Sequence, residues 1–193
     1  MRTKTGIWIV FVLVFFASCE EESYIPKPKG FFRIDFPEHQ YQKAETSDCP
    51  FTFEIGSLAR IETVQAKGGQ KCWFNLVYPS VKSTVHFSYY DISNRNVNEL
   101  IEDSRKLAVE HLAMADDFEE SVISDPTQKV YGMIYDFEGN TASNYQFYLT
   151  DSTNHFVRGA LYFRVLPNAD SLAPAEKYIE EELLHLVSTF KWN

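Results

Sequence analysis

Apolar and polar side chains alternate along most of the chain, which is the pattern of strands with one buried face. The alternating runs are residues 32–36, 49–56, 59–66, 71–78, 83–91, 130–137, 144–151 and 155–163. Gly68 and Gly69 predict a hairpin between two of these runs, because both glycines readily take positive φ. Short turn-like connections join the last three runs and predict an antiparallel meander.

Two segments instead place apolar side chains three and four residues apart, which predicts helices. The first is residues 97–114, with Asn96 as its cap, and two aspartates that follow break its pattern. No strand is predicted between this helix and residue 130. The second helix runs from about 172 to 190. Together the elements indicate an α+β fold, a mostly antiparallel sheet with two main helices packed on it, and their order is similar to the PsbP/Mog1-like sandwich.

The first eighteen residues are typical of a lipoprotein signal peptide. Arg2 and Lys4 precede the ten apolar residues 7–16, which are about half the length that spans a membrane. Small residues then lead into Cys19, and the stretch "FASC" resembles the lipobox of bacterial lipoproteins. That resemblance implies cleavage before Cys19 and its modification with acyl chains such as palmitate, which together anchor a protein stably.

Residues 19–30 are expected to be a lipid-anchored tether, and residues 31–193 a single globular domain. Pro26 and Pro28 keep the tether extended. The acidic run at 20–22 resembles a surface-export signal of some envelope lipoproteins, although a solvated tether explains it as well. We therefore expect the domain to face the periplasm, with the cell surface as the alternative.

Charge excludes one class of partner. Without the signal peptide, 16 basic and 27 acidic side chains remain, and the net charge is −11. A protein this acidic does not bind nucleic acid non-specifically, and an anionic membrane repels it. The lipid, rather than the charge of the domain, is expected to hold it at the bilayer.

No motif specific to a catalytic, cofactor or metal site appears in the sequence. Five histidines lack metal-ligand spacing: His39, His86, His111, His155 and His185. Of these, His86, His111 and His185 are expected to pack at the edge of the core. The carboxylate runs at 116–117, 119–120 and 180–182 are interpreted as solvated surface rather than as an acid–base pair. We therefore expect no enzymatic activity and no cofactor.

Aromatic side chains make up 16% of the chain and keep a second function open. Most of them are needed for the core. Five tyrosines in predicted strands are candidates for an exposed binding face: Tyr89, Tyr90, Tyr145, Tyr148 and Tyr162. Tyrosine suits interfaces because it combines an apolar ring with a polar tip. The alternative function is a periplasmic or surface ligand-binding module with an aromatic-lined pocket.

Cys49 and Cys72 remain once Cys19 is lipidated, and an even number of cysteines in an oxidising compartment favours a disulfide. A simple antiparallel meander of these strands argues against the disulfide. With strand 59–66 between them, the two cysteines would lie about 9.6 Å apart, beyond the ~7 Å that a disulfide allows between Cα atoms. Either the pair is not bonded, or Cys49 lies in a loop, or the strand order is different.

Several stretches together resemble the gliding-motility lipoprotein GldD family over nearly the whole mature chain. They are "FASC", "YIPKPKGFFRIDFPEHQYQ", "CPFTFE", "KCWFNLVYP" and "SLAPAEKYIEEELLHLVSTFKW". The resemblance implies a non-enzymatic envelope lipoprotein that is required for gliding, with other gliding and type IX secretion proteins as partners. It also implies that Cys19 carries the lipid and that Cys49 and Cys72 pair.

Overall fold

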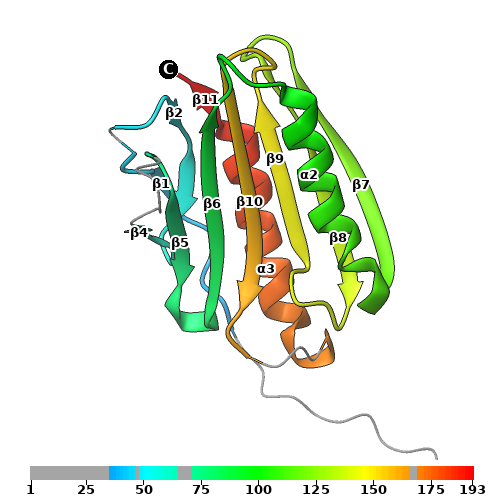
Figure 1. Cartoon of the computed structure of the whole chain (residues 1–193). Coiled ribbons are helices and arrows are strands. Elements are labelled where there is room, and N and C mark those ends of the chain that lie inside the picture. The colour runs from blue at the N-terminus through cyan, green and yellow to red at the C-terminus, as the bar shows by residue number, and fades with distance from the viewer. Residues whose placement is uncertain (1–34, 47, 65–70, 166–168) are drawn as a thin grey trace, which may run out of the picture. The chain divides into compact units, whose positions relative to one another are not determined.

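A seven-stranded antiparallel sheet forms the centre of the domain (Figure 1). The computed structural model describes residues 35–193, apart from residue 47 and the segments 65–70 and 166–168. The sheet strands, in their order across the sheet, are β4 (Arg60–Thr63), β5 (Phe74–Tyr78), β6 (Ser83–Asp91), β10 (His155–Phe163), β9 (Tyr145–Thr150), β8 (Val130–Gly139) and β7 (Ala115–Asp125). Its two edges are therefore β4 and β7.

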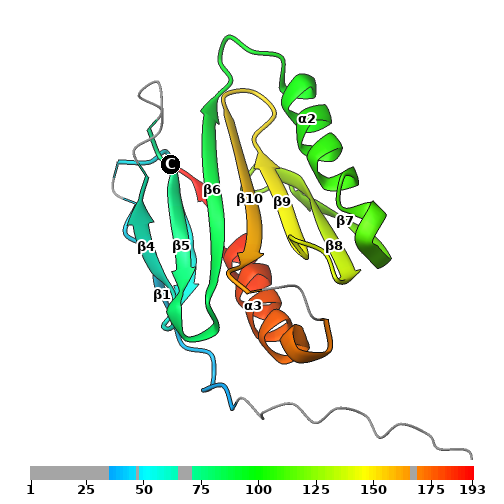
Figure 2. The same cartoon turned by 60° about the horizontal axis from the view of Figure 1, so that its bottom comes forward.

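Helices α2 (Val97–Val109) and α3 (Ala169–Thr189) cover opposite faces of this sheet (Figures 1 and 2). Two successive residues of β10 show why each face of the sheet has its own helix. Phe156 packs in the cluster that contains Ala108 of α2, whereas its neighbour Val157 packs in the cluster that contains Ile179 of α3. Because side chains alternate across a strand, each face of the sheet buries its own helix.

Two small sheets lie beside α3. One pairs β1 (Tyr41–Lys43) with β3 (Glu54–Gly56), and the other pairs β2 (Phe51–Thr52) with β11 (Lys191–Trp192). Two 3-10 turns complete the described elements, η1 (Pro79–Val81) and η2 (Leu112–Met114). The second small sheet secures the C-terminus, because Phe51 stacks on Phe190, the residue between α3 and β11, at a ring-centroid distance of 5.3 Å.

The fold class predicted from the sequence is confirmed, but one strand was missed. The predicted helix 97–114 ends at Val109, with the Asn96 side chain capping its start as expected. The chain then passes through η2 into β7, in the segment where no strand was predicted. β7 lies at the edge of the sheet, so its sequence is largely polar and shows no alternation. Its carboxylates are typical of edge strands that must not pair with another chain.

Two further predictions need correction at the start of the domain. Asp35 and Phe36, the described end of the predicted strand 32–36, are not in a strand, and the rest of that run lies outside the described residues. The run 49–56 is divided at Phe53 into two strands that belong to different sheets. The predicted turn at Gly68 and Gly69 also lies outside the described residues, although β4 and β5 pair as a hairpin requires.

A disulfide joins Cys49 and Cys72, with 5.5 Å between their Cα atoms. Cys49 lies in the loop before β2, and β2 pairs with the C-terminal β11 instead of joining the large sheet. The simple meander, in which strand 59–66 would lie between the two cysteines, is therefore wrong. β2 is not a neighbour of β4 in the large sheet, so Cys49 is able to reach Cys72.

We expect the Cys49→Ser/Cys72→Ser double variant to lose about 3 kcal/mol of unfolding free energy, because the bond restricts the unfolded chain over a separation of 23 residues. Urea denaturation with and without dithiothreitol measures this. The wild type should lose stability in the reductant and the double variant should not respond. Equal wild-type midpoints in both conditions would contradict the prediction.

The segment that enters the domain, residues 36–41, packs along α3 and is called the entry segment below. Phe36 and His39 both stack on Tyr178, with ring centroids 4.5 and 4.2 Å away. Tyr41 stacks on His185, seven residues further along the helix, at 3.5 Å. One face of α3 therefore receives three consecutive rings of the entry segment.

Glu182 lies within this contact and is only 1% exposed, so its interpretation as solvated surface is wrong. His39 Nδ1 lies 2.5 Å from Glu182 Oε1, and His39 Nε2 lies 3.0 Å from Glu181 Oε2. A protonated imidazolium donates to both carboxylates at once. Burial alone would lower the pKa of His39, but these hydrogen bonds and the two negative charges raise it.

Gly56 provides the space for the buried carboxylate. A Cβ atom at this position would lie 1.5 Å from Glu182 Oε2. We expect Gly56→Ala to lower the unfolding free energy by about 2–3 kcal/mol, because Glu182 must then leave its site and lose His39. Chemical denaturation measures the loss, and Ser57→Ala, at the exposed neighbouring position, is the matched control. Equal stability of the two variants would show that the close approach is unimportant.

Candidate binding site

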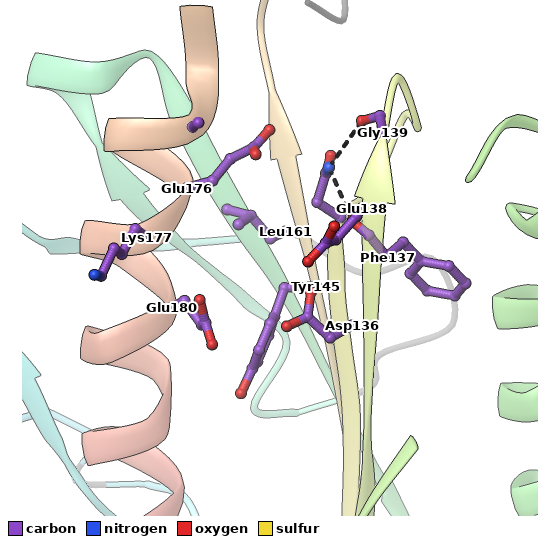
Figure 3. Close-up of a pocket in the computed structure, with 11 residues that line it drawn as sticks. Asp136, Phe137, Glu138, Gly139, Tyr145, Leu161, Glu176, Lys177 and Glu180 are labelled. Atoms are coloured by element: carbon purple, nitrogen blue, oxygen red, sulfur yellow. Dashed lines mark hydrogen bonds between the residues drawn. The ribbon is translucent and has the colours of Figure 1, made fainter. Parts of the chain in front are cut away.

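An acidic cavity of about 470 Å³ lies between α3 and the sheet (Figure 3). Four carboxylates line it: Asp136 and Glu138 from β8, and Glu176 and Glu180 from α3. Among the described lining residues, Lys177 is the only cation. The described lining of the cavity therefore carries more negative than positive side chains.

Simple periodicities bring these carboxylates together. Asp136 and Glu138 are two residues apart on a strand, so they point to the same face. Glu176 and Glu180 are four residues apart on α3, so they lie one turn apart on one side of the helix. Tyr145 pairs directly with Asp136 across β8 and β9, which places its side chain on the same face as Asp136.

Asn144 fixes the end of β8 at the rim of the cavity. Its side-chain Nδ2 donates to the carbonyl oxygens of Phe137 and Gly139, at 3.1 and 3.2 Å. Figure 3 shows both bonds beside the labelled Glu138. This amide therefore holds in place the strand segment that carries Asp136 and Glu138.

The carboxylates alter one another's protonation. Burial and the charges of neighbouring carboxylates, Glu180 first, raise the pKa of Asp136 to about 6. Burial and the charge of Asp136 raise the pKa of Glu176 to about 7. The pKa of Glu180 is raised as well, by burial and by Glu181, against the opposing effect of Lys177. Near neutral pH the site therefore exchanges protons and is able to balance a cation.

Tyr145 is the buried polar group of the site. The residue is 3% exposed, and its hydroxyl oxygen has no hydrogen-bond partner among the described residues. Its ring lies between Glu180 and Asp136 in Figure 3. Burial and these two carboxylates raise its pKa above the usual value, so the hydroxyl keeps its proton.

The structure disperses most of the residues singled out in the sequence. His86 contacts Asn75, His155 contacts Tyr89, and His185 contacts Glu54, each pair at 2.7–2.9 Å. Within the described part of the chain, no three His, Cys, Asp or Glu side chains are placed to hold a metal ion. Cys19 lies outside the described residues.

The candidate tyrosine face does not form as one surface, in keeping with the preferred interpretation of these tyrosines as the edge of the core. Tyr145 and Tyr148 are buried at 3% and 8% exposure, and they belong to clusters on opposite faces of the sheet. Tyr145 alone of the five lines the acidic cavity. This cavity could not be predicted from the sequence, because its carboxylates come from segments forty residues apart and only Glu180 belongs to a run of consecutive carboxylates.

The domain is of the α+β class, with a seven-stranded antiparallel sheet and an acidic cavity under its C-terminal helix. The family model of the gliding motility lipoprotein GldD matches residues 21–192, so the chain belongs to that family. Membership associates the protein with gliding motility and with lipid-anchored proteins of the cell envelope. In the part of the chain that the structure describes, no helix combines the length and apolar character needed to cross a bilayer.

Other comparisons are limited to the fold. No curated protein matches the chain. The solution structure of cyanobacterial PsbP (CyanoP) from Synechocystis sp. PCC 6803 is similar, with a TM-score of 0.46 and 9% sequence identity. The similarity covers 79% of this chain and 92% of that one.

The raised pKa values have a measurable consequence. Folded Asp136 and Glu176 keep protons that the unfolded chain releases, so the wild type should lose stability as the pH rises from about 4 to about 8. We expect Asp136→Asn and Glu176→Gln each to add about 1 kcal/mol of unfolding free energy at pH 8, a value reduced for partial exposure, and little below pH 4. Urea denaturation across this range measures both effects.

Glu45→Gln, which removes an exposed carboxylate away from the cavity, is the matched control and should change nothing. His39 contributes in the same direction, because its raised pKa gives stability below about pH 6.5 that is lost as the pH rises through the folded value. A smaller pH dependence should therefore remain when Asp136→Asn and Glu176→Gln are combined in one protein. Destabilisation by both cavity variants at pH 8 would contradict the prediction.

Proposed function

We propose that the protein is a non-enzymatic, lipid-anchored scaffold or assembly component of the gliding and type IX secretion machinery. The match of the GldD family model to residues 21–192 carries this proposal, because it associates the chain with gliding. We infer that the domain faces the periplasm and that its partners are other envelope proteins of the same machinery.

The construction of the domain supports a scaffolding role. The entry segment is the part of the domain that follows the tether in sequence, and it packs on α3 through ring stacking and the His39 contacts. α3 in turn supplies Ile179 and Leu183 to the main core. A pull on the tether would therefore be shared between the longest helix and the sheet.

The chemistry of the cavity supports recognition more than catalysis. Its described lining offers four carboxylates and one lysine, whereas the Tyr145 hydroxyl is buried. The ring of Phe137 packs against Phe118 on the opposite face of the sheet, so Tyr145 supplies the one aromatic ring among the described lining residues and the alternative of an aromatic-lined ligand pocket gains little support. We therefore retain the scaffold as the proposed function.

Deletion of the gene should abolish gliding, and Cys19→Ala should reproduce the defect because the exported domain then lacks its anchor. Ser18→Ala is the matched control, since it keeps a small residue before the lipidated cysteine. Colony spreading, membrane fractionation and the amount of protein released to the medium are the measurements. Normal gliding by cells whose exported protein is unlipidated would defeat the anchoring part of the proposal.

In-cell crosslinking with mass spectrometry tests the scaffold itself. Crosslinks to gliding or secretion proteins of the envelope are expected. A protein that crosslinks solely to itself, in cells that glide normally, would remove the proposed place in the machinery.

A further inference from the structure

One face of the large sheet is only partly covered by a helix. α2 contacts β9 and β10, whereas no helix of the described chain lies over the same side of β5 and β6 (Figures 1 and 2). Directly paired residues share a face of a sheet, as do residues two apart on one strand. This side of β4, β5, β6 and β10 is called the open face, and its side chains include Arg60, Glu62, Thr84, His86, Arg158 and Tyr162.

The open face is cationic although the chain is acidic, with a net charge of −11 once the signal peptide is removed. Arg164, the residue after β10, also lies on this face, because its Nη2 donates to Thr84 Oγ1. Among the strand residues of the face, Glu62 is the one carboxylate, and it pairs with Arg60 at 2.7 Å. Arg158 and Arg164 therefore give the face an excess of positive charge.

Buried and uncharged side chains hold these two arginines in place. Arg158 Nη2 donates to Gln146 Oε1 at 2.7 Å, and Arg164 Nη2 donates to Thr84 Oγ1 at 3.2 Å. Gln146 and Thr84 are each 1% exposed. No ion pair between described residues involves either arginine. Each guanidinium group is thus oriented but not neutralised, and its fork of N–H donors matches the two oxygens of a carboxylate.

Arg158 lies in a pocket of about 270 Å³ between α2 and the sheet. Burial lowers the pKa of its guanidinium group, which nevertheless stays charged at physiological pH. Leu100 and Phe156 add apolar walls, whereas Asp103 and Glu110, the carboxylates at this pocket, form no ion pair with Arg158. Charge-assisted hydrogen bonds are strong where water is partly excluded. The pocket is therefore suited to one carboxylate-bearing side chain.

Aromatic rings lie between the two arginines. The rings of His86 and Tyr162 are 5.5 Å apart. Burial and the charge of Arg164 lower the pKa of His86, so its imidazole is neutral at physiological pH. Tyrosine and arginine are the residues that most often dominate the binding energy of protein interfaces. This composition favours a protein ligand, because the net charge of the chain repels a long polyanion.

We propose that the open face binds an acidic segment of a partner protein, with one carboxylate of the segment held by Arg158 and a second by Arg164. This inference rests on the proposed function, because it identifies the surface through which the scaffold holds a partner. The rest of the domain repels an acidic segment, so the attraction is local to this face.

The test uses the full chain in a non-ionic detergent and the blocked heptapeptide acetyl-Glu-Gly-Ser-Gly-Ser-Gly-Glu-amide. Arg158 and Arg164 are six residues apart, as are the two glutamates of the peptide, and six extended residues span roughly 20 Å. The matched peptide has glutamine at both positions. Calorimetry gives the affinity, and chemical-shift changes at the two arginine side chains report the place of binding.

Saturable binding of the glutamate peptide, at least about tenfold tighter than that of the glutamine peptide, supports the proposal. No binding, or equal binding of the two peptides, would overturn it.

Three variants that each remove one positive charge locate the site. Arg158→Gln should weaken binding about tenfold through loss of hydrogen bonds to a charged group, and the exposed Arg164→Gln about threefold. Arg105→Gln, at an exposed position of α2 outside the pocket, should leave binding unchanged. Urea denaturation checks that each variant folds, and Arg164→Gln still tests the site if Arg158→Gln does not fold. Equal affinities of the folded variants would contradict the proposal.

Two other sources of carboxylates are outcomes of the same assay. The chain's own acidic run consists of Glu20, Glu21 and Glu22. If their replacement by glutamine tightens peptide binding, the tether occupies the open face and the partner assignment fails, whereas unchanged affinity supports an external partner. Displacement of the peptide by tighter binding of oligogalacturonate, a carboxylated oligosaccharide, would also overturn the assignment to a protein.

In-cell crosslinking separates this inference from the proposed function. Arg158→Gln/Arg164→Gln should lose at least one crosslink that the wild type forms with a protein of the machinery. A double variant that keeps every crosslink overturns the inference and leaves the proposed function standing. A wild type without such crosslinks removes the proposed function itself, whereas the peptide assay still decides whether the open face binds carboxylates.

Discussion

The packing of α3 against the sheet is the constraint on which the rest of the structure depends. The helix supplies Ile179 and Leu183 to the main core, so its rotation is fixed by apolar burial. That rotation decides where its acidic residues go. Glu176 and Glu180 meet β8 on one side, and Glu182 meets the entry segment and Gly56 on another. Three carboxylates on one helix therefore have two different environments, a partly buried cavity for Glu176 and Glu180 and a buried contact for Glu182.

Strands and helices with one buried face could be predicted from periodicity alone. The run 83–91 coincides with β6, and α3 differs from its predicted range by a few residues at its start. The predictions of strands fail where no buried face imposes an alternating pattern, or where the pattern does not decide which strands pair. β7 is an edge strand whose side chains are mostly in water. The run 51–55 does alternate, but the alternation does not show that β2 and β3 pair in different sheets. Periodicity also does not predict which strands share a sheet, although this decides whether Cys49 lies close enough to Cys72 to form a disulfide.

The candidate site was less predictable than the fold. A run of three glutamates on a predicted helix indicates solvent, and Glu181 meets that expectation whereas Glu182 does not. What distinguishes them is the contact with Gly56, which is distant in sequence and has no side chain to signal it. Likewise, Asp136 is unremarkable in a strand until Tyr145 and α3 exclude water from it. The chemistry of this domain arises from contacts that only the tertiary structure creates.

The two acidic environments make the stability of the domain change with pH in the same direction. A raised pKa at Asp136 and Glu176 means that these groups oppose folding when ionised, and a raised pKa at His39 means that its ion pairs favour folding when protonated. Both terms lower stability as the pH rises.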